Sequence, residues 1–330
     1  MSTPLRIVQI GLGPLGQMLT PHLLERTSLK LTGAVDISPE VVGTDLGTHI
    51  QQSPLGIAIT DNLDDALENA DVAVVTTVSE LERLAPLLEK ICAHGVHVVS
   101  TCEELSYPWQ THPELSKKID TLAKANNVSI LGTGINPGFL MDFLPTAITG
   151  LCQRVDSIHA YRIQDASPRR LPFRQKIGAG LSIEEFKKRV ETQKIRHVGL
   201  TESMHMIAAR LGWRLDRTED VVEPIITQTD VRGDDWHVAP GFATGVHQMG
   251  YGYVGDKRKI TLDFQAAVGQ LDPQERVHIY GSPEFDLIIP GGINGDAATC
   301  SVITNAIPVV ANAAPGLRTM VDIPPISCSQ

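Results

Sequence analysis

Near its start the chain reads Leu5-Arg6-Ile7-Val8-Gln9-Ile10-Gly11-Leu12-Gly13-Pro14-Leu15-Gly16, a short apolar strand pattern that runs directly into a glycine-rich turn. In a strand–turn–helix unit of this kind the three glycines have separate tasks. Gly11 makes a tight turn, Gly13 lets the backbone approach a pyrophosphate, and Gly16 lets the helix pack closely on the strand. We expect a helix from about Pro14 to Thr27, whose N-terminal amides point at the same anion.

A second strand pattern, Leu29–Val35, ends in Asp36, twenty residues after Gly16. An acid at this place accepts hydrogen bonds from a ribose 2′-hydroxyl and repels a 2′-phosphate, which favours NAD. No arginine follows in Ile37-Ser38-Pro39, although Ser38 can hydrogen-bond a phosphate. The sequence therefore predicts a nicotinamide dinucleotide cofactor, NAD or NADP.

Composition excludes several classes of protein. The net charge of −10 argues against nucleic-acid and anionic-membrane partners. No apolar stretch is long enough to span a bilayer, and the early first strand leaves no room for a signal peptide, so we expect a cytoplasmic protein. The five cysteines are scattered and lack a Cys-x-x-Cys pair, and no set of His, Cys and Asp residues has metal-ligand spacing, so we expect neither disulfides nor a metal site.

The 330 residues predict two domains with a C-terminal extension. In residues 1–150 strand and helix patterns alternate, which indicates an α/β fold with a doubly wound parallel sheet, the Rossmann arrangement. Residues 151–295 are rich in strands with few helices, which predicts a second α+β domain for substrate binding and dimerisation, built on an open mixed sheet. Residues 296–330 contain a last helix whose apolar run is expected to pack back on the first domain.

In a parallel sheet, ligands sit beyond the carboxyl ends of the strands. Four loops follow strands in this way: 11–16, 76–79, 101–104 and 132–138. Together with the acid-bearing loop after Val35, they supply the candidate cofactor-binding residues, which are Gly11, Gly13, Pro14, Leu15, Gly16, Asp36, Ser38, Thr76, Thr77, Thr101, Cys102, Asn136 and Pro137.

Two adjacent carboxylates, Glu103 and Glu104, follow the strand pattern His97–Val99. A carboxylate there can exchange a proton with an amine or stabilise an iminium. Alternatively both acids simply begin a helix, where they complement its dipole. In the second domain Arg162, Arg169, Arg170 and Arg174 form either a carboxylate or phosphate clamp or a solvated basic loop, in a segment expected to be irregular from Asp165 to Arg174.

Longer motifs carry a family resemblance. They are the glycine turn, Ser100-Thr101-Cys102-Glu103-Glu104-Leu105-Ser106-Tyr107-Pro108-Trp109, Gly132-Thr133-Gly134-Ile135-Asn136-Pro137-Gly138-Phe139-Leu140-Met141-Asp142, and Gly295-Asp296-Ala297-Ala298-Thr299 ahead of Asn305-Ala306-Ile307-Pro308. With these the chain resembles the dihydrodipicolinate reductase-like group, above all 2,4-diaminopentanoate dehydrogenases and native amine dehydrogenases. The Gly-Thr-Thr-Gly loop and paired histidines of the reductases themselves are missing, which speaks against a heterocyclic diacid substrate.

The resemblance implies an NAD(P)-dependent oxidoreductase, usually a homodimer, that deaminates a small primary amine to a ketone and ammonia or runs the reverse reductive amination. A diamino acid such as 2,4-diaminopentanoate is the alternative substrate. It implies that Glu103, or else Glu104, carries the proton and iminium chemistry in a pocket between the domains. Phe139, Leu140 and Met141 would line the apolar substrate pocket, with Tyr161, Phe173, Ile177 and Thr299 as weaker candidates.

Two rival functions stay open. A hydroxy-acid or sugar dehydrogenase would use the same cofactor with a lysine or histidine acid–base, and Lys176 is a candidate. A non-catalytic redox sensor would bind the dinucleotide and signal through Cys102, which would require a thiol of low pKa.

Overall fold

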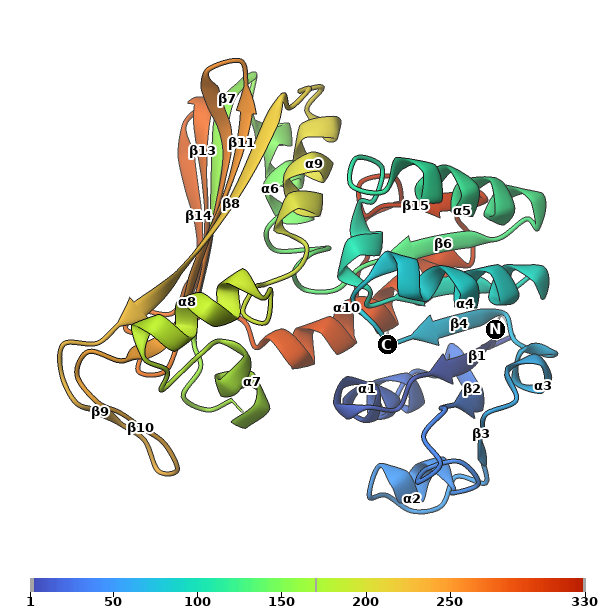
Figure 1. Cartoon of the computed structure of the whole chain (residues 1–330). Helices are drawn as coiled ribbons and strands as arrows, with labels where there is room; N and C mark the ends of the chain where they lie inside the picture. The colour runs from blue at the N-terminus through green and yellow to red at the C-terminus, as the bar shows by residue number, and fades with distance from the viewer. Residues whose placement is uncertain (1–2, 170, 329–330) are drawn as a thin grey trace. The chain divides into compact units, whose positions relative to one another are not determined.

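The computed structural model describes residues 3–169 and 171–328. They form two compact units, Met1–Phe139 together with Asn294–Gln330, and Leu140–Ile293 (Figure 1). The chain thus leaves the first unit after Phe139 and returns to it at Asn294, close to the residue at which the last helix was expected to begin. Each unit is built around its own sheet.

The first unit holds a seven-stranded sheet in which every pair of neighbours is parallel. Its order is β15-β6-β5-β4-β1-β2-β3, and its strands are β1 Leu5–Ile10, β2 Leu29–Val35, β3 Ile59–Thr60, β4 Val72–Val75, β5 His97–Ser100, β6 Ser129–Gly132 and β15 Gly316–Arg318. This confirms the predicted Rossmann-like parallel sheet. The strand β15 was not expected, because three residues after a Pro-Gly pair show no periodicity.

Helices cover both faces of this sheet. On β1, Val8 and Ile10 belong to the core cluster that contains Leu84 and Leu88 of α4, whereas Gln9 faces α1. The helix α10 packs against α1 and β5. The helices of the unit are α1 Pro14–Leu24, α2 Leu46–His49, α3 Leu63–Leu67, α4 Leu81–Ala93, α5 Pro113–Ala125 and α10 Gly295–Val310, with a 3₁₀ turn η1 at Glu103–Ser106.

The second unit holds a six-stranded sheet of order β14-β13-β7-β12-β11-β8. Only β7 and β12 are parallel, and the other neighbours are antiparallel. This confirms the predicted open mixed sheet. The strands are β7 Arg154–Asp165, β8 Arg217–Ile226, β11 Ala243–Val254, β12 Lys257–Ala267, β13 Gln274–Ser282 and β14 Phe285–Pro290, and a separate hairpin pairs β9 Val231–Arg232 with β10 His237–Val238.

One face of the mixed sheet is apolar and covered by helices. Ile158 and Leu262 of the sheet share a core cluster with Phe186 of α8 and Met204 of α9. Because side chains alternate along a strand, the opposite face carries His159 and its neighbours on every second position. The helices of this unit are α6 Phe143–Ile148, α7 Leu171–Lys176, α8 Ile183–Glu191 and α9 Leu200–Arg210, with a 3₁₀ turn η2 at Thr149–Leu151.

The prediction of an irregular loop from Asp165 to Arg174 is wrong for the second half of this segment, because α7 begins at Leu171. Its Pro172 lies in the first turn, where a missing amide hydrogen leaves no helical hydrogen bond unmade. Proline was therefore a poor reason to exclude a helix here. Arg170 lies outside the described residues.

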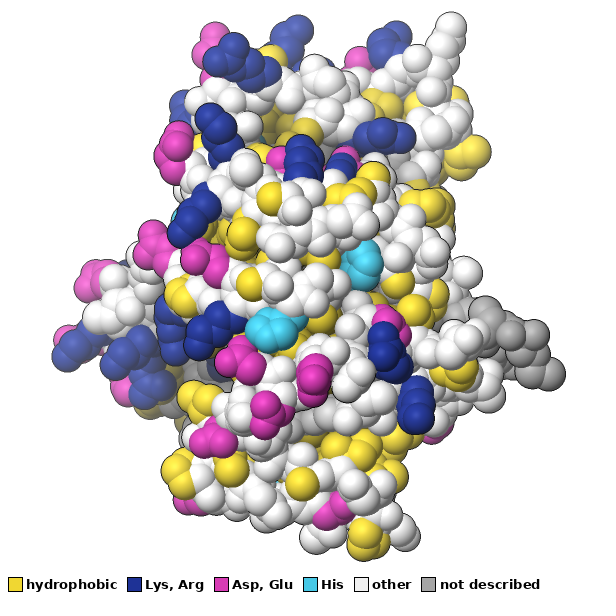
Figure 2. All heavy atoms as spheres, turned by 90° about the vertical axis from the view of Figure 1, so that its right-hand side faces the viewer, with side chains coloured by type: hydrophobic (Ala, Val, Ile, Leu, Met, Phe, Trp, Pro, Cys, Tyr) yellow, Lys and Arg dark blue, Asp and Glu magenta, His cyan; other side chains and the backbone are white. Residues whose placement is uncertain are grey.

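The surface view shows Lys and Arg side chains interspersed with Asp and Glu on the face turned to the viewer (Figure 2). Within residues 3–169 and 171–328, none of the helices has the length and apolar character to cross a membrane.

Candidate active site

The glycine turn has the local geometry that its sequence predicts. Gly11 has a φ of +92°, in the left-handed region that favours glycine. A Cβ on Gly16 would stand 2.2 Å from the carbonyl oxygen of Gly11, whereas a Cβ on Gly13 would meet nothing within 4 Å. Gly11 therefore turns the chain, Gly16 lies against the backbone, and Gly13 faces open space. Open space beside the first turn of α1 is what an approaching pyrophosphate needs.

Buried polar side chains hold the start of α1 on β1. The Nε2 of Gln9 donates to the carbonyl oxygen of Gly16 at 2.7 Å, and the Oγ1 of Thr20 donates to Oε1 of Gln9 at 2.8 Å. Gln9 and Thr20 are both fully buried. The close approach of helix and strand is therefore fixed by hydrogen bonds as well as by the missing side chain at Gly16.

Asp36 links the end of β2 to the glycine turn. Its Oδ2 accepts from the amide of Leu12 at 2.7 Å, and its Oδ1 accepts from the amide of Ser38 at 2.9 Å. Directly after β4, which lies on the other side of β1, the Oγ1 of Thr76 donates to the carbonyl oxygen of Gly11 at 2.7 Å. The ends of β1, β2 and β4 are thus tied together around the turn, and the predicted cofactor residues of these three loops meet there.

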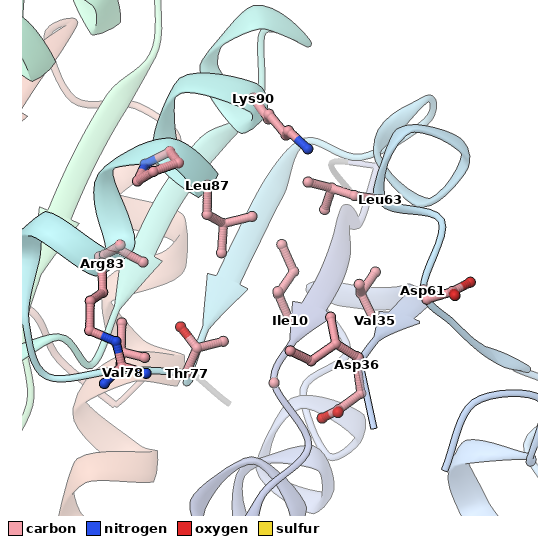
Figure 3. A pocket seen from close by; sticks show the side chains of 14 residues that line it. Ile10, Val35, Asp36, Asp61, Leu63, Thr77, Val78, Arg83, Leu87 and Lys90 are labelled. Atoms are coloured by element: carbon pink, nitrogen blue, oxygen red, sulfur yellow. The ribbon is translucent and has the colours of Figure 1, made fainter. Parts of the chain in front are cut away.

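An apolar cavity of about 410 Å³ opens beside this turn, within the first unit. The sticks in Figure 3 show Ile10 of β1, Val35 of β2 and Leu63 of α3 on one side and Leu87 of α4 on the other. Gly11, Asp36 and Thr77 also line the cavity and were singled out from the sequence. The other lining residues were not; besides the four apolar ones, they are Ile37, Asp61, Val78, Arg83, Leu84, Pro86 and Lys90. One signal could have found the α4 residues, because a helix that follows a strand-end loop begins at the ligand-facing edge.

The two glutamates after β5 have different environments. Oε2 of Glu104 accepts from the amide of Leu81 at 2.7 Å and lies 3.7 Å from Nε2 of His112. Leu81 is the first residue of α4, and the N-cap of that helix, Glu80, makes no side-chain capping bond. Glu104 therefore supplies the missing cap of α4, not of its own turn. Glu103 is half-buried and begins η1, at the carboxyl end of β5.

Cys102, the residue before Glu103, is buried. Its Sγ donates to the carbonyl oxygen of Ser79 at 3.1 Å. Burial raises the pKa of the Cys102 thiol to about 12. A thiol of this kind stays protonated at neutral pH and is a poor nucleophile, which weighs against the redox-sensor function.

The loop after β6 contacts α10 inside the first unit. The amide of Ile135 donates to Oγ1 of Thr299 at 3.3 Å, and the Asn136–Pro137 peptide bond is cis. Gly138 has a φ of +127°, and a Cβ there would stand 2.5 Å from the amide nitrogen of Gly134. The structure thus brings Thr299 together with the loop that the sequence placed at the cofactor, at the edge where Thr101 follows β5.

The substrate candidates of the second unit are divided between the two faces of its sheet. Met141 and Ile177 are buried in the core cluster, and Phe173 packs against that cluster. Tyr161 follows Ala160 of the same cluster on β7, so its ring lies on the opposite face of the sheet. There it stacks on the ring of His159, with 3.7 Å between the ring centroids. Tyr161 is therefore not brought together with the other three. Leu140 is buried and Phe139 is half-buried at the end of the first unit.

Two of the four arginines, Arg162 and Arg174, form ion pairs inside the second unit. They are therefore neither part of a carboxylate clamp nor part of a solvated basic loop. Nη1 of Arg162 donates to Oε1 of Glu275 at 2.6 Å, and their side chains are only 2% and 4% exposed. Burial raises the pKa of Glu275 to about 7, against the pull of Arg162. Arg174 binds both carboxylate oxygens of Asp235 in the β9–β10 hairpin.

We expect Arg162→Met to lower the free energy of unfolding by about 3–5 kcal/mol, because it leaves the buried Glu275 without its partner. The double variant Arg162→Met/Glu275→Leu should recover most of this loss, since it removes both charges. Urea unfolding followed by circular dichroism measures both. A single variant as stable as the wild type would show that the pair contributes nothing.

Among the described residues, no group of three or more His, Cys, Asp and Glu side chains could hold a metal ion. The candidate reacting groups are the carboxylates of Glu103 and Glu104 after β5. They stand where a parallel sheet presents its ligands, beside a glycine turn shaped for a pyrophosphate.

Both the N-terminal and the C-terminal part of the chain match known protein families. Residues 5–130 match the N-terminal domain of dihydrodipicolinate reductase, and residues 139–329 match the C-terminal domain of 2,4-diaminopentanoate dehydrogenase. The 2,4-diaminopentanoate dehydrogenase of Acetoanaerobium sticklandii is 34% identical over 97% of this chain and 93% of its own length. An amine dehydrogenase of Streptomyces virginiae is 23% identical over 95% of this chain and 94% of its own length.

Among solved structures, the amine dehydrogenase of Mycobacterium smegmatis superposes with a TM-score of 0.84 at 25% identity, covering 98% of this chain and 97% of that one. The similarity thus runs across both units. This chain belongs to the 2,4-diaminopentanoate dehydrogenase and amine dehydrogenase family, whose members are NAD(P)-dependent oxidoreductases acting on CH–NH₂ donors.

Proposed function

We propose that this enzyme oxidatively deaminates a diamino acid of the 2,4-diaminopentanoate type, and that it also catalyses the reverse reductive amination. The observation that carries this choice is the 34% identity to a 2,4-diaminopentanoate dehydrogenase over nearly the whole chain. A simple alkyl amine, the substrate first expected from the sequence, is the second candidate. It is supported by the likeness to the M. smegmatis amine dehydrogenase and by the apolar side chains of Phe139 and Leu140.

In the proposed reaction a protonated amine, an oxidised dinucleotide and water give a ketone, an ammonium ion, the reduced dinucleotide and a proton. When bound, the nicotinamide accepts the hydride from the carbon that bears the amine. Glu103 takes a proton from the substrate ammonium group, so that the nitrogen lone pair can form the C=N bond as the hydride leaves. After that proton has passed to solvent, the carboxylate stabilises the iminium cation and takes the proton of the water that adds to the carbon. It returns this proton to the nitrogen, which leaves with the C–N electron pair as ammonia.

We assign this role to Glu103, which begins η1 at the carboxyl end of β5, and give Glu104 a structural role. One oxygen of Glu104 caps α4 through the amide of Leu81. Rotating Glu104 toward a substrate would leave that amide without its acceptor, at a cost of about 1–3 kcal/mol. Adjacent residues on a short turn also point in different directions, so one of the two glutamates can face the substrate while the other faces α4.

Cofactor preference follows from Asp36. Its carboxylate is fixed by the amides of Leu12 and Ser38, so it presents a negative charge at the end of β2. We propose that the enzyme prefers NAD and tolerates NADP, with Ser38 as the donor available to a 2′-phosphate. The homodimer implied by the resemblance and the cytoplasmic location expected from the sequence stay predictions.

We propose no role in substrate binding for Arg162 and Arg174, because they are paired with Glu275 and Asp235. The guanidinium of Arg169 lies over the ring of Phe173, 3.9 Å from the centre of that ring.

We expect initial rates with 2,4-diaminopentanoate to exceed those with 2-aminobutane and cyclohexylamine. A wild type that prefers the alkyl amines would contradict the diamino acid assignment.

A further inference from the structure

The hairpin formed by β9 and β10 is tied to α7 by an ion pair that the proposed function does not use. Nη1 and Nη2 of Arg174 donate to Oδ1 and Oδ2 of Asp235 at 3.0 and 2.5 Å. The side chain of Arg174, in α7, is only 7% exposed, whereas that of Asp235 is 68% exposed. A carboxylate at the surface thus reaches a guanidinium inside the second unit. Paired hydrogen bonds of this kind fix the orientation of the two groups as well as their distance.

Asp235 stands at the tip of the hairpin. The amide of Gly233 donates to the carbonyl oxygen of Trp236 at 3.0 Å, so the turn between them presents Asp234 and Asp235. Figure 1 shows the hairpin projecting from the mixed sheet at the end where α7 and α8 lie. The hydrogen bonds from Arg174 lower the pKa of the Asp235 carboxyl, so this group stays charged through the neutral range.

The hairpin also contributes to the apolar core on which α7 packs. Trp236 packs against the core cluster of the second unit, and Val238 is a buried member of it. A Cβ on Gly233 would stand 2.3 Å from Nε1 of Trp236, so the indole ring lies directly on the hairpin backbone. The same cluster contains Ile177, the residue after α7, and Phe173 of α7 packs against it. The hairpin and α7 are therefore joined by one shared core and one ion pair.

This inference rests on the proposed function, because it needs α7 to lie beside the substrate. Met141 belongs to the same core cluster as Ile177. It directly follows Phe139 and Leu140, the apolar side chains proposed for the substrate pocket, and these come after the glycine-rich loop at the ligand-facing end of β6. Since protein interiors are close-packed, a shift of α7 is transmitted through the shared core to this segment.

We propose that Asp235 is a positioning residue for the substrate site: residues 231–238 form a strap on α7, and the ion pair with Arg174 holds the strap closed. The closed strap keeps α7 in the place where Phe173 packs on the core. Without the carboxylate the hairpin is released at its tip, Trp236 becomes more exposed, and α7 can shift. Asp235 acts through Arg174 and touches no reacting atom, so its loss weakens substrate binding and leaves the chemical step intact.

Asp235→Ala is the test, because an exposed side chain can be shortened without leaving a hole in the core. With saturating dinucleotide, KM for the amine that the wild type oxidises fastest should rise roughly threefold to tenfold, while kcat stays within about twofold. Asp235→Glu keeps the carboxylate and should restore most of the loss. Asp234→Ala, at the exposed neighbour in the same turn, is the matched control and should leave both constants unchanged.

Tryptophan fluorescence follows the strap itself and needs no substrate. Asp235→Ala should move the emission to longer wavelength and increase its quenching by acrylamide, because Trp236 gains contact with water. In a Trp236→Phe background the same substitution should change neither quantity, which assigns the signal to this residue. Asp234→Ala should leave the fluorescence of the wild type unchanged.

Unchanged fluorescence in Asp235→Ala would overturn the proposal, and so would a fluorescence change without a rise in KM. An equal rise in KM in Asp234→Ala, or a kcat that falls together with the melting temperature, would overturn it as well, because neither result depends on the ion pair alone. A wild type that oxidises no amine would contradict the proposed function instead, while the fluorescence of Asp235→Ala would still show whether the ion pair closes the strap.

Discussion

Glu103→Gln should lower kcat for amine oxidation by about 10²- to 10⁴-fold, the range lost when a general acid–base group is removed. Glutamine keeps the size of the side chain but can neither take the ammonium proton nor balance the charge of an iminium. Dinucleotide affinity should stay within about twofold of the wild type, because the carboxylate acts on the substrate and not on the cofactor. Steady-state kinetics with saturating amine, together with NADH titration, measures both quantities.

The neighbouring glutamate is the matched control. Glu104→Ala should retain turnover within roughly one order of magnitude and lose about 1–2 kcal/mol of stability, because the amide of Leu81 loses its acceptor at the start of α4. If Glu104→Ala abolished turnover while Glu103→Gln kept it, the two roles would be exchanged. Full turnover in both variants would remove the acid–base step from this loop altogether.

Gly13→Ala should separate cofactor binding from folding. Gly13 has a φ of −64° and space for a Cβ, so the methyl group introduces no backbone strain and no clash, and stability should change by less than about 1 kcal/mol. The methyl group would instead stand where the pyrophosphate approaches. We expect dinucleotide affinity to fall roughly tenfold or more, as measured by NADH titration of a variant whose melting temperature is normal.

Gly16→Ala should instead lower the stability of the fold before any effect on cofactor binding is measured. Its Cβ would stand 2.2 Å from the carbonyl oxygen of Gly11, and backbone on both sides has to move to make room. We expect a loss of about 1–3 kcal/mol in stability, typical of overpacking, seen as a lower melting temperature without ligand. Equal stability of the two variants would contradict the separate tasks that we assign to these glycines.

The sequence predicted the parts of the fold that depend on local periodicity and glycine chemistry. The strand before Gly11, the acid at the end of β2 and the alternation up to residue 150 all reflect interactions between residues close in the chain. The strand β15 and the helix α7 were missed for a related reason. Each is short, and each is stabilised by contacts with distant segments, so its own residues show little pattern.

The site was predictable only in part, for the same physical reason. Glu103 and Glu104 are adjacent and identical in chemistry, and only the amide of Leu81, more than twenty residues earlier, tells them apart. Likewise nothing close to Arg162 in the sequence shows that Glu275, on the neighbouring strand β13, forms an ion pair with it. Arg83 was missed because a single arginine in a helix reads as a solvated charge until the cavity beside it is known.

Ammonia release measured against cofactor reduction is the most direct test of the account. With 2,4-diaminopentanoate and NAD, the wild-type enzyme should release one ammonium ion for each dinucleotide reduced, and Glu103→Gln should produce neither. A wild type that reduces the dinucleotide with this substrate, or with any other, without releasing ammonia would contradict oxidation at a carbon–nitrogen bond.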